Sequence, residues 1–295
     1  MNRIGSWRSV LGVAALVVCL GAVRPAGAAP NTGRFSLSGG FDFTTAYFFR
    51  GILQERNGLI WQPYLTVSAN LYSVDDYDLG RDGPVNSVSL FAGTWASLHS
   101  EHTGSTDNNT PVFYENDWLG GMNVGLFNKL TAGFSYVAYT SPSDAFRTVQ
   151  EFDLNLALDD SEWLGTFALY PSAVVAYEFD KRALGEDNGA YLQLGIRPAF
   201  EVIKSERYPV TLAIPIVAGF SLNDYYETNG SNDETWGYTT FGLVGSIPLA
   251  FIPEDYGSWA FTMGATLYTF NHNLQEINDD DDPWVVGTAG ISISY

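Results

Sequence analysis

The fold is decided by residues 35–72, which read FSLSGGFDFTTAYFFRGILQERNGLIWQPYLTVSANLY. Apolar side chains fill most odd positions from Phe35 to Phe49, and small or polar ones fill most even positions. After a turn region at 51–58 the alternation resumes from Leu59 to Tyr72. A two-residue period is typical of a strand with one apolar face. Both runs exceed the about 5–6 residues of an average strand and reach the about 9–11 that cross a membrane. The stretch therefore predicts a hairpin of two membrane-crossing strands.

The same unit recurs along the chain, most clearly at residues 149–158. There Phe152, Leu154, Leu156 and Leu158 are expected to face lipid, and Glu151, Asp153 and Asn155 the lumen. The predicted strands are 35–50, 59–72, 85–98, 112–126, 130–140, 149–158, 163–179, 190–201, 210–221, 236–249, 258–270 and 284–295. We therefore predict an all-β fold, a single antiparallel transmembrane β-barrel of about 12 strands in meander order, with both termini on the periplasmic side. A secreted β-sandwich is the alternative.

The N-terminus has the pattern of a secretory signal peptide. Basic Arg3 and Arg8 precede an apolar run, and small residues follow at 26–28. Cleavage is expected after Ala28, which leaves residues 29–295 as the barrel; an uncleaved anchor is the alternative. The single cysteine, Cys19, lies in the removed segment, so the mature protein is expected to have no thiol chemistry.

Composition favours an exported membrane barrel. The chain carries 33 acidic and 14 basic residues, a formal charge of −19, which disfavours nucleic acid as a partner. Charged residues are 16% and aromatic residues 15% of the chain, whereas soluble domains are about 25% charged. The mature part contains no apolar run near the about 18 residues of a membrane helix. We expect an outer-membrane location with lipid and lipopolysaccharide as partners.

Tryptophans near the predicted strand ends suggest interfacial aromatic girdles, with core packing in a sandwich as the alternative. They are Trp61, Trp95, Trp118, Trp236, Trp259 and Trp284. The last strand ends on an aromatic residue, Tyr295. This resembles the carboxyl-terminal signal recognised by the barrel-insertion machinery, which we expect as a further partner.

No residue pattern points to catalysis, a cofactor or a metal. His99 and His102 share a loop with Glu101, but no third ligand stands at a convincing spacing. An outer-membrane lipid esterase would need a Ser–His pair oriented by a third polar group, and no such pairing is specific in the sequence. The run Asp279–Asp282 offers oxygen ligands of the kind that suit Ca²⁺, but a solvated charge run is the favoured interpretation.

The inward faces of the predicted strands suggest a pore lining. The candidates for the lining and for ion selectivity are Asp42, Arg50, Glu115, Asp117, Glu151, Asp153, Glu178 and Arg197. Near the outer mouth five of these are acids on one wall and Arg50 stands on the other, which predicts a preference for cations. Pairing of Arg50 with a neighbour such as Glu55 is the alternative. Bulky inward side chains could instead block the lumen: Phe48, Tyr64, Tyr191 and Phe270.

Three segments resemble the TorF family of outer-membrane porins. The segment Thr44–Gln54 carries the aromatic–Arg–Gly–Ile–x–Gln pattern that this family has at the end of its first strand, with Leu53 where Ser is more common. Residues 114–118, followed by glycines, and residues 136–142 are similar in order and spacing. The resemblance implies a porin-like barrel and no particular substrate. The function expected from the sequence is passive diffusion of small hydrophilic solutes; the alternatives are a structural or adhesive barrel with a closed lumen, or an outer-membrane lipid esterase.

Overall fold

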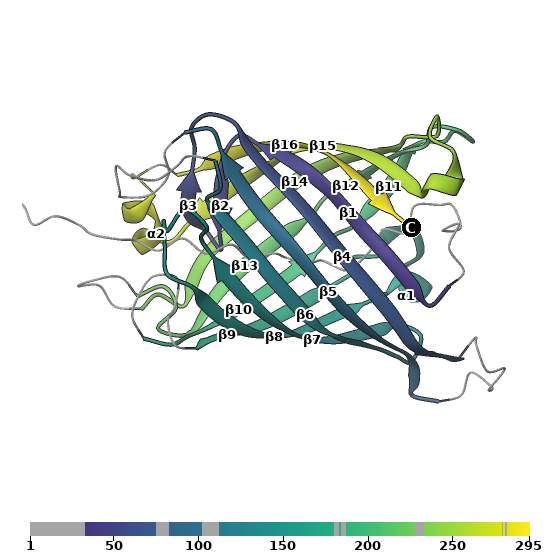
Figure 1. Ribbon diagram of the computed structural model, residues 1–295, viewed down its shortest axis with the longest axis horizontal. Coiled ribbons are helices and arrows are strands. Elements are labelled where there is room, and N and C mark those ends of the chain that lie inside the picture. Colours follow the sequence, from purple (N-terminus) through teal and green to yellow (C-terminus); the bar gives the residue numbers. More distant parts are fainter. Residues whose placement is uncertain are drawn as a thin grey trace, which may run out of the picture.

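The computed structural model describes residues 33–74, 83–101, 112–179, 183, 187–227, 233–278, 280 and 282–295. Fourteen antiparallel segments form one sheet, which closes on itself where β14 (Trp236–Pro248) pairs with β15 (Ser258–Phe270). Two passes across the barrel are each made of two segments, so the barrel has twelve strands, as predicted. Neighbouring strands follow one another in the chain, and β1 (Phe35–Thr44) pairs with the last strand, β16 (Trp284–Ser294) (Figure 1).

The remaining strands run alternately between the two ends of the barrel, and β1 begins at the end where β16 finishes. They are β4 (Ile60–Ser73), β5 (Val85–His99), β6 (Glu115–Leu126), β7 (Leu130–Thr140), β8 (Val149–Leu158), β9 (Ser172–Phe179), β10 (Gly189–Ile196), β11 (Ala199–Ile203), β12 (Val210–Ala213) and β13 (Ile216–Asn223). β10 with β11, and β12 with β13, form single passes. An even number of strands places both termini on the periplasmic side.

Side-chain exposure confirms the predicted alternation. On β8, Phe152 and Leu154 are 42% and 49% exposed on the outer wall, whereas Glu151 is 0% exposed inside. Trp118 on β6 is 58% exposed outside, but Trp95 on β5 points inward and is buried, so only some of the tryptophans can belong to a girdle. A closed barrel satisfies its backbone hydrogen bonds internally, and an apolar outer wall around a polar interior is the arrangement of an outer-membrane barrel.

Prolines explain the two divided passes. Pro198 separates β10 from β11, and Pro215 separates β12 from β13. Proline has no N–H to donate to a ladder, but its carbonyl still accepts a hydrogen bond. Ile214 N donates to Pro198 O at 2.9 Å and Gly242 N donates to Pro215 O at 2.8 Å, so the wall stays closed at both breaks.

The first predicted strand is too long. β1 ends at Thr44, and the chain then forms a separate small hairpin of β2 (Tyr47–Phe49) and β3 (Ile52–Glu55). Phe49 and Ile52 are fully buried, not exposed to lipid. The hairpin lies at the same end of the barrel as α2 (His272–Ile277), opposite the C-terminus (Figure 1). The alternation of apolar residues continued through 45–50 because these side chains pack inside the mouth.

The seventh predicted strand also begins too early. Residues 161–167 form a short helix, α1 (Ser161–Leu164), and a 3-10 turn, η2 (Gly165–Phe167), in a periplasmic connector. A second 3-10 turn, η3 (Glu254–Tyr256), lies in another. Asp160 organises the first connector, since its carboxylate accepts from Leu169 N and Tyr170 N. No helix within the described ranges is long and apolar enough to cross a membrane.

The last residue of the chain pairs with the first strand. Leu37 N donates to Tyr295 O at 2.7 Å, and Tyr295 N donates to Leu37 O at 2.8 Å. The C-terminal residue thus closes the barrel against its first strand. The expected signal peptide, residues 1–28, lies outside the described residues.

Candidate functional site at the outer mouth

The tip of the β2–β3 hairpin is a two-residue turn made by Arg50 and Gly51. Both have positive φ, 45° and 87°, as the tight turns of hairpins require. A Cβ on Gly51 would stand 2.8 Å from Leu274 Cδ1 and 2.9 Å from a ring carbon of Tyr238. The turn therefore needs glycine both for its backbone conformation and for the close approach of its neighbours.

The Arg50 side chain reaches across the mouth to the wall formed by β8 and β9. Its Nη1 and Nη2 donate to the two carboxylate oxygens of Glu151, at 2.6 Å and 2.8 Å. Nη1 also lies 3.1 Å from Glu178 Oε1. Arg50 is 5% exposed and both glutamates 0%. A two-pronged arginine–carboxylate pair is among the stronger hydrogen-bonded contacts in proteins, so this contact fixes the hairpin tip against the wall.

Tyrosines complete the surroundings of the guanidinium. Its central carbon lies 4.3 Å from the ring centroid of Tyr191 and 5.4 Å from that of Tyr225, within range of cation–π attraction. Tyr225 Oη accepts from Arg50 Nη1 at 2.9 Å and donates to Glu178 at 2.7 Å. Tyr139 Oη donates to Glu151 at 2.6 Å. We call the five residues Glu151, Glu178, Tyr139, Tyr191 and Tyr225 the Arg50 socket.

Further contacts tie the hairpin to other parts of the mouth. Tyr47 Oη donates to Glu115 on β6 at 2.9 Å. Asn278, which follows α2, accepts from Leu53 N at 2.9 Å and donates to Gly51 O at 2.8 Å. Phe48 stacks on Tyr268 and Phe270 of β15, with ring centroids 4.8 Å and 5.4 Å apart. The hairpin is thus held on three sides and fills the outer mouth.

The structure brings together three of the eight predicted lining residues, Arg50, Glu151 and Glu178. The prediction placed Arg50 and the acids on opposite walls; instead the hairpin carries Arg50 across the lumen into direct contact with two of them. Glu55, the alternative partner, accepts from Arg56 N and Asn57 N. Strand periodicity could not foresee this, because the chain leaves the wall after Thr44.

The other five candidates are distributed along the inner wall. Glu115 and Asp117 are buried on β6, and Asp153 on β8 accepts from Ser135 Oγ at 3.3 Å. Neither carboxylate oxygen of Asp117 has a hydrogen-bond partner among the described residues. Asp42 and Arg197 are partly buried and stand apart from the socket, on β1 and just after β10. Among the predicted lining residues of the outer half, the acids therefore outnumber the one arginine, Arg50.

A Ser–His contact lies beside the hairpin. Ser97 Oγ is 2.8 Å from His99 Nε2, and His99 Nδ1 is 4.0 Å from Glu55 Oε2. The order of the three side chains is that of a hydrolytic triad, but Ser97 is fully buried and Tyr114 stacks on the imidazole. In this state the group packs the hairpin against β5 and offers no face to a substrate.

No group of three His, Cys, Asp or Glu side chains within the described ranges is arranged to hold a metal ion. His102, Asp279 and Asp281 lie outside those ranges. Asp282 accepts from Phe270 N at 3.3 Å and from Gln275 Nε2 at 3.0 Å, so it ties the loop after α2 back to β15.

Several residues of the site had no signal in the sequence. Tyr225 and Tyr226 lie in an outer loop, where no periodicity assigns a direction; Tyr226 Oη donates to Arg50 O at 3.2 Å. Asn278 likewise had no signal in the sequence. Tyr139 could have been found, because it shares the inward face of β7 with Ser135 and Val137.

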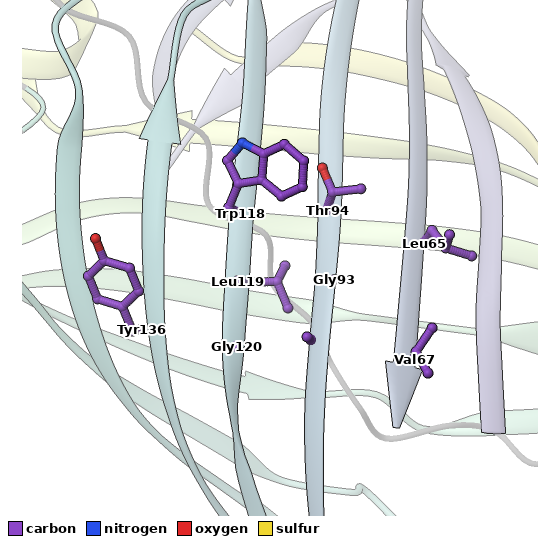
Figure 2. Close-up of a pocket in the computed structure, with 9 residues that line it drawn as sticks. Leu65, Val67, Gly93, Thr94, Trp118, Leu119, Gly120 and Tyr136 are labelled. Atoms are coloured by element: carbon purple, nitrogen blue, oxygen red, sulfur yellow. The ribbon is translucent and has the colours of Figure 1, made fainter. Parts of the chain in front are cut away.

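A depression lies on the lipid-facing wall, apart from the Arg50 socket. Its volume is 480 Å³, and Leu65, Val67, Trp118 and Tyr136 border a floor of small residues on β5 and β6, including Gly93 and Gly120 (Figure 2). No charged side chain lines it. This depression follows from small residues on the outer wall and offers no chemistry.

Comparison with solved structures finds distant likenesses. The β domain of the Bordetella autotransporter BrkA is 9% identical with a TM-score of 0.43, over 89% of this chain and 99% of that chain. The porin NanC is 12% identical with a TM-score of 0.41, over 88% and 98%. LpxR from Salmonella typhimurium is 9% identical with a TM-score of 0.40, over 88% and 99%. At such values the likeness is one of fold and carries nothing about activity.

No family model matches the sequence, and no curated protein matches it. The closed twelve-stranded barrel, its apolar outer wall and its polar interior define the class: this chain is an outer-membrane β-barrel.

Proposed function

We propose that this protein is a porin-like channel for small hydrophilic solutes, with a preference for cations, whose outer mouth is closed by the β2–β3 hairpin in the state described here. The observation that carries the proposal is the way in which the mouth is closed. The hairpin tip is joined to the far wall through a guanidinium and two carboxylates, contacts that water and ions can replace when the hairpin moves.

The composition of the inner wall supports a hydrophilic path. Along β8 the inward positions are Glu151, Asp153 and Asn155, and on β6 they include Glu115 and Asp117. Acids inside a low-dielectric wall attract cations and repel anions. The likeness of the Thr44–Gln54 segment to TorF porins supports the same class, since that segment forms the hairpin.

Conductance of the purified protein in a planar bilayer tests the channel. We expect the wild type to be mostly closed with brief openings, and Arg50→Ala to be open for a larger fraction of the time. A structural or adhesive barrel with a closed lumen is the second candidate, because Phe49, Ile52 and the tip of the hairpin are buried like a protein core. If neither protein conducts, the closed-lumen function replaces the channel.

The reversal potential across a salt gradient tests selectivity. The double substitution Asp117→Asn with Asp153→Asn replaces two inner-wall carboxyl groups and leaves the Arg50 contacts in place; it should reduce the cation preference, more so at low salt. Glu162→Gln is the matched control, since that side chain is 65% exposed on the periplasmic connector. An anion-selective wild type, or an unchanged preference in the double variant, would exclude the mechanism.

The proposed partners follow from the location. The apolar outer wall would contact lipid and, on the outer side, lipopolysaccharide. Tyr295 would serve recognition by the insertion machinery before it joins the ladder with Leu37. No nucleic acid and no cofactor is proposed.

A further inference from the structure

The Arg50 socket surrounds a guanidinium with complementary groups from four strands and one loop. Glu151 offers its two carboxylate oxygens in the plane of the fork, Glu178 and Tyr225 offer further acceptors, and Tyr191 covers one face of the guanidinium at 4.3 Å. Planar, delocalised guanidinium suits such a two-pronged and stacked arrangement better than a compact ammonium.

We propose that the socket is a binding site for solutes that bear a guanidinium group, and that Arg50 is its tethered occupant. Such a solute would take the place of the Arg50 fork between Glu151 and Tyr191 and remove the ion pairs that join the hairpin tip to the far wall. That such a solute opens the channel rests on the proposed function, whereas its binding to the socket does not.

Only one side chain must leave for the exchange to occur. Gly51, the other residue of the tip, and Ile52 after it carry no charge, and the hairpin meets the two socket glutamates through the Arg50 fork. A two-residue turn can thus withdraw its arginine while β2 and β3 stay paired.

The tethered occupant is also imperfectly satisfied. Arg50 Nε is buried and has no hydrogen-bond partner among the described residues, and an unmade bond of a buried donor is costly. Two carboxyl groups, those of Glu151 and Glu178, face this single guanidinium. Both features favour replacement of the Arg50 side chain by a free guanidinium solute, whose nitrogen atoms can keep hydrogen bonds to water.

The experiment uses the full-length protein in detergent and measures binding of ethylguanidinium by calorimetry. Arg50→Ala vacates the socket and should bind ethylguanidinium more tightly than ethylammonium, by a factor on the order of ten, which corresponds to about 1.4 kcal/mol. The matched control is Arg50→Ala with Glu151→Gln and Glu178→Gln, in which ethylguanidinium binding should be lost. Equal binding to both variants, or no preference over ethylammonium, would overturn the proposal.

A second measurement keeps Arg50 and covers the case in which Arg50→Ala does not fold. In Leu53→Cys the introduced thiol is the only one outside the segment expected to be cleaved, and Leu53 is partly buried beside the tip. Ethylguanidinium, but not sodium at equal ionic strength, should increase the rate at which maleimide labels this thiol. An unchanged rate would contradict the displacement. If ethylguanidinium binds but the protein does not conduct, the binding site stands and the channel is excluded. If the protein conducts but ethylguanidinium does not bind, the channel stands and the binding site is excluded.

Discussion

β8 turns one face to the lumen along its whole length, but the inward side chains of its outer half and of its periplasmic half have different surroundings. Glu151, near the outer end, is completely buried and bonded to Arg50 and Tyr139. Asn155, four residues closer to the periplasm, is only partly buried and donates to Ser135 Oγ at 3.4 Å. The wall is the same; the difference is that the chain's own hairpin fills the outer half.

This contrast teaches that inward charge has two roles in this barrel. In the outer half, Glu115, Glu151 and Glu178 are bonded to the β2–β3 hairpin, and their removal should affect stability. In the periplasmic half, polar residues line the wall without a tight partner, and their replacement should affect little but the solute path. The predictions below test that division.

The largest effect is expected for Arg50→Leu. It leaves Glu151 and Glu178 buried without their cation, which should lower the free energy of unfolding by about 3–5 kcal/mol. Arg197→Leu is the matched control in the periplasmic half, where the side chain is partly exposed, and a change under about 1 kcal/mol is expected. Urea unfolding in lipid vesicles measures the change for both variants, and equal losses of unfolding free energy would contradict the distinction between the two halves.

The next effect separates the two faces of β8. Leu154→Arg places a charge on the lipid-facing wall and should cost about 2–4 kcal/mol near the bilayer centre. Asn155→Arg, one residue along and facing the lumen, should be tolerated better. The same unfolding assay applies; similar costs at both positions would mean that both faces are buried, as in a sandwich.

Gly51→Ala tests the hairpin turn. An alanine at positive φ costs about 1–2 kcal/mol, and here its Cβ would also meet Leu274 and Tyr238. Gly165→Ala is the control, because Gly165 has φ of 58° but nothing within 4 Å of the added atom. We expect the larger loss of unfolding free energy at Gly51, together with faster proteolysis of the hairpin. A loss no greater than at Gly165 would show that the mouth is loosely packed.

The smallest effect is expected for Asn278→Ala, which removes two hydrogen bonds to the hairpin backbone. Each contributes about 1 kcal/mol, so the free energy of unfolding should fall by roughly 2 kcal/mol. Asn188→Ala, an exposed residue of the loop before β10, should change it little. Hydrogen exchange of the Leu53 amide gives a local readout, and unchanged protection there would contradict the anchoring role.

The amino-acid sequence by itself determined the barrel. The two-residue alternation of residues such as Phe152 and Leu154 with Glu151 and Asp153 specifies which face meets lipid, since a strand has no other period. Strand number, order and the orientation of the termini followed from counting these units. The sequence also identified Arg50, Glu151 and Glu178 as inward and near the mouth, because alternation and strand direction are local properties.

Only the tertiary structure decided what these residues do. Periodicity cannot tell whether the apolar positions 47 and 49 face lipid or the packed interior, because both surroundings accept the same side chains. Burial of the β2–β3 hairpin requires partners that are far apart in the chain: Glu115, Glu178, Tyr225 and Asn278. Such contacts depend on closure of the whole barrel, which brings residues from both halves of the chain to the same mouth. No local sequence pattern predicts contacts between residues so far apart in the chain.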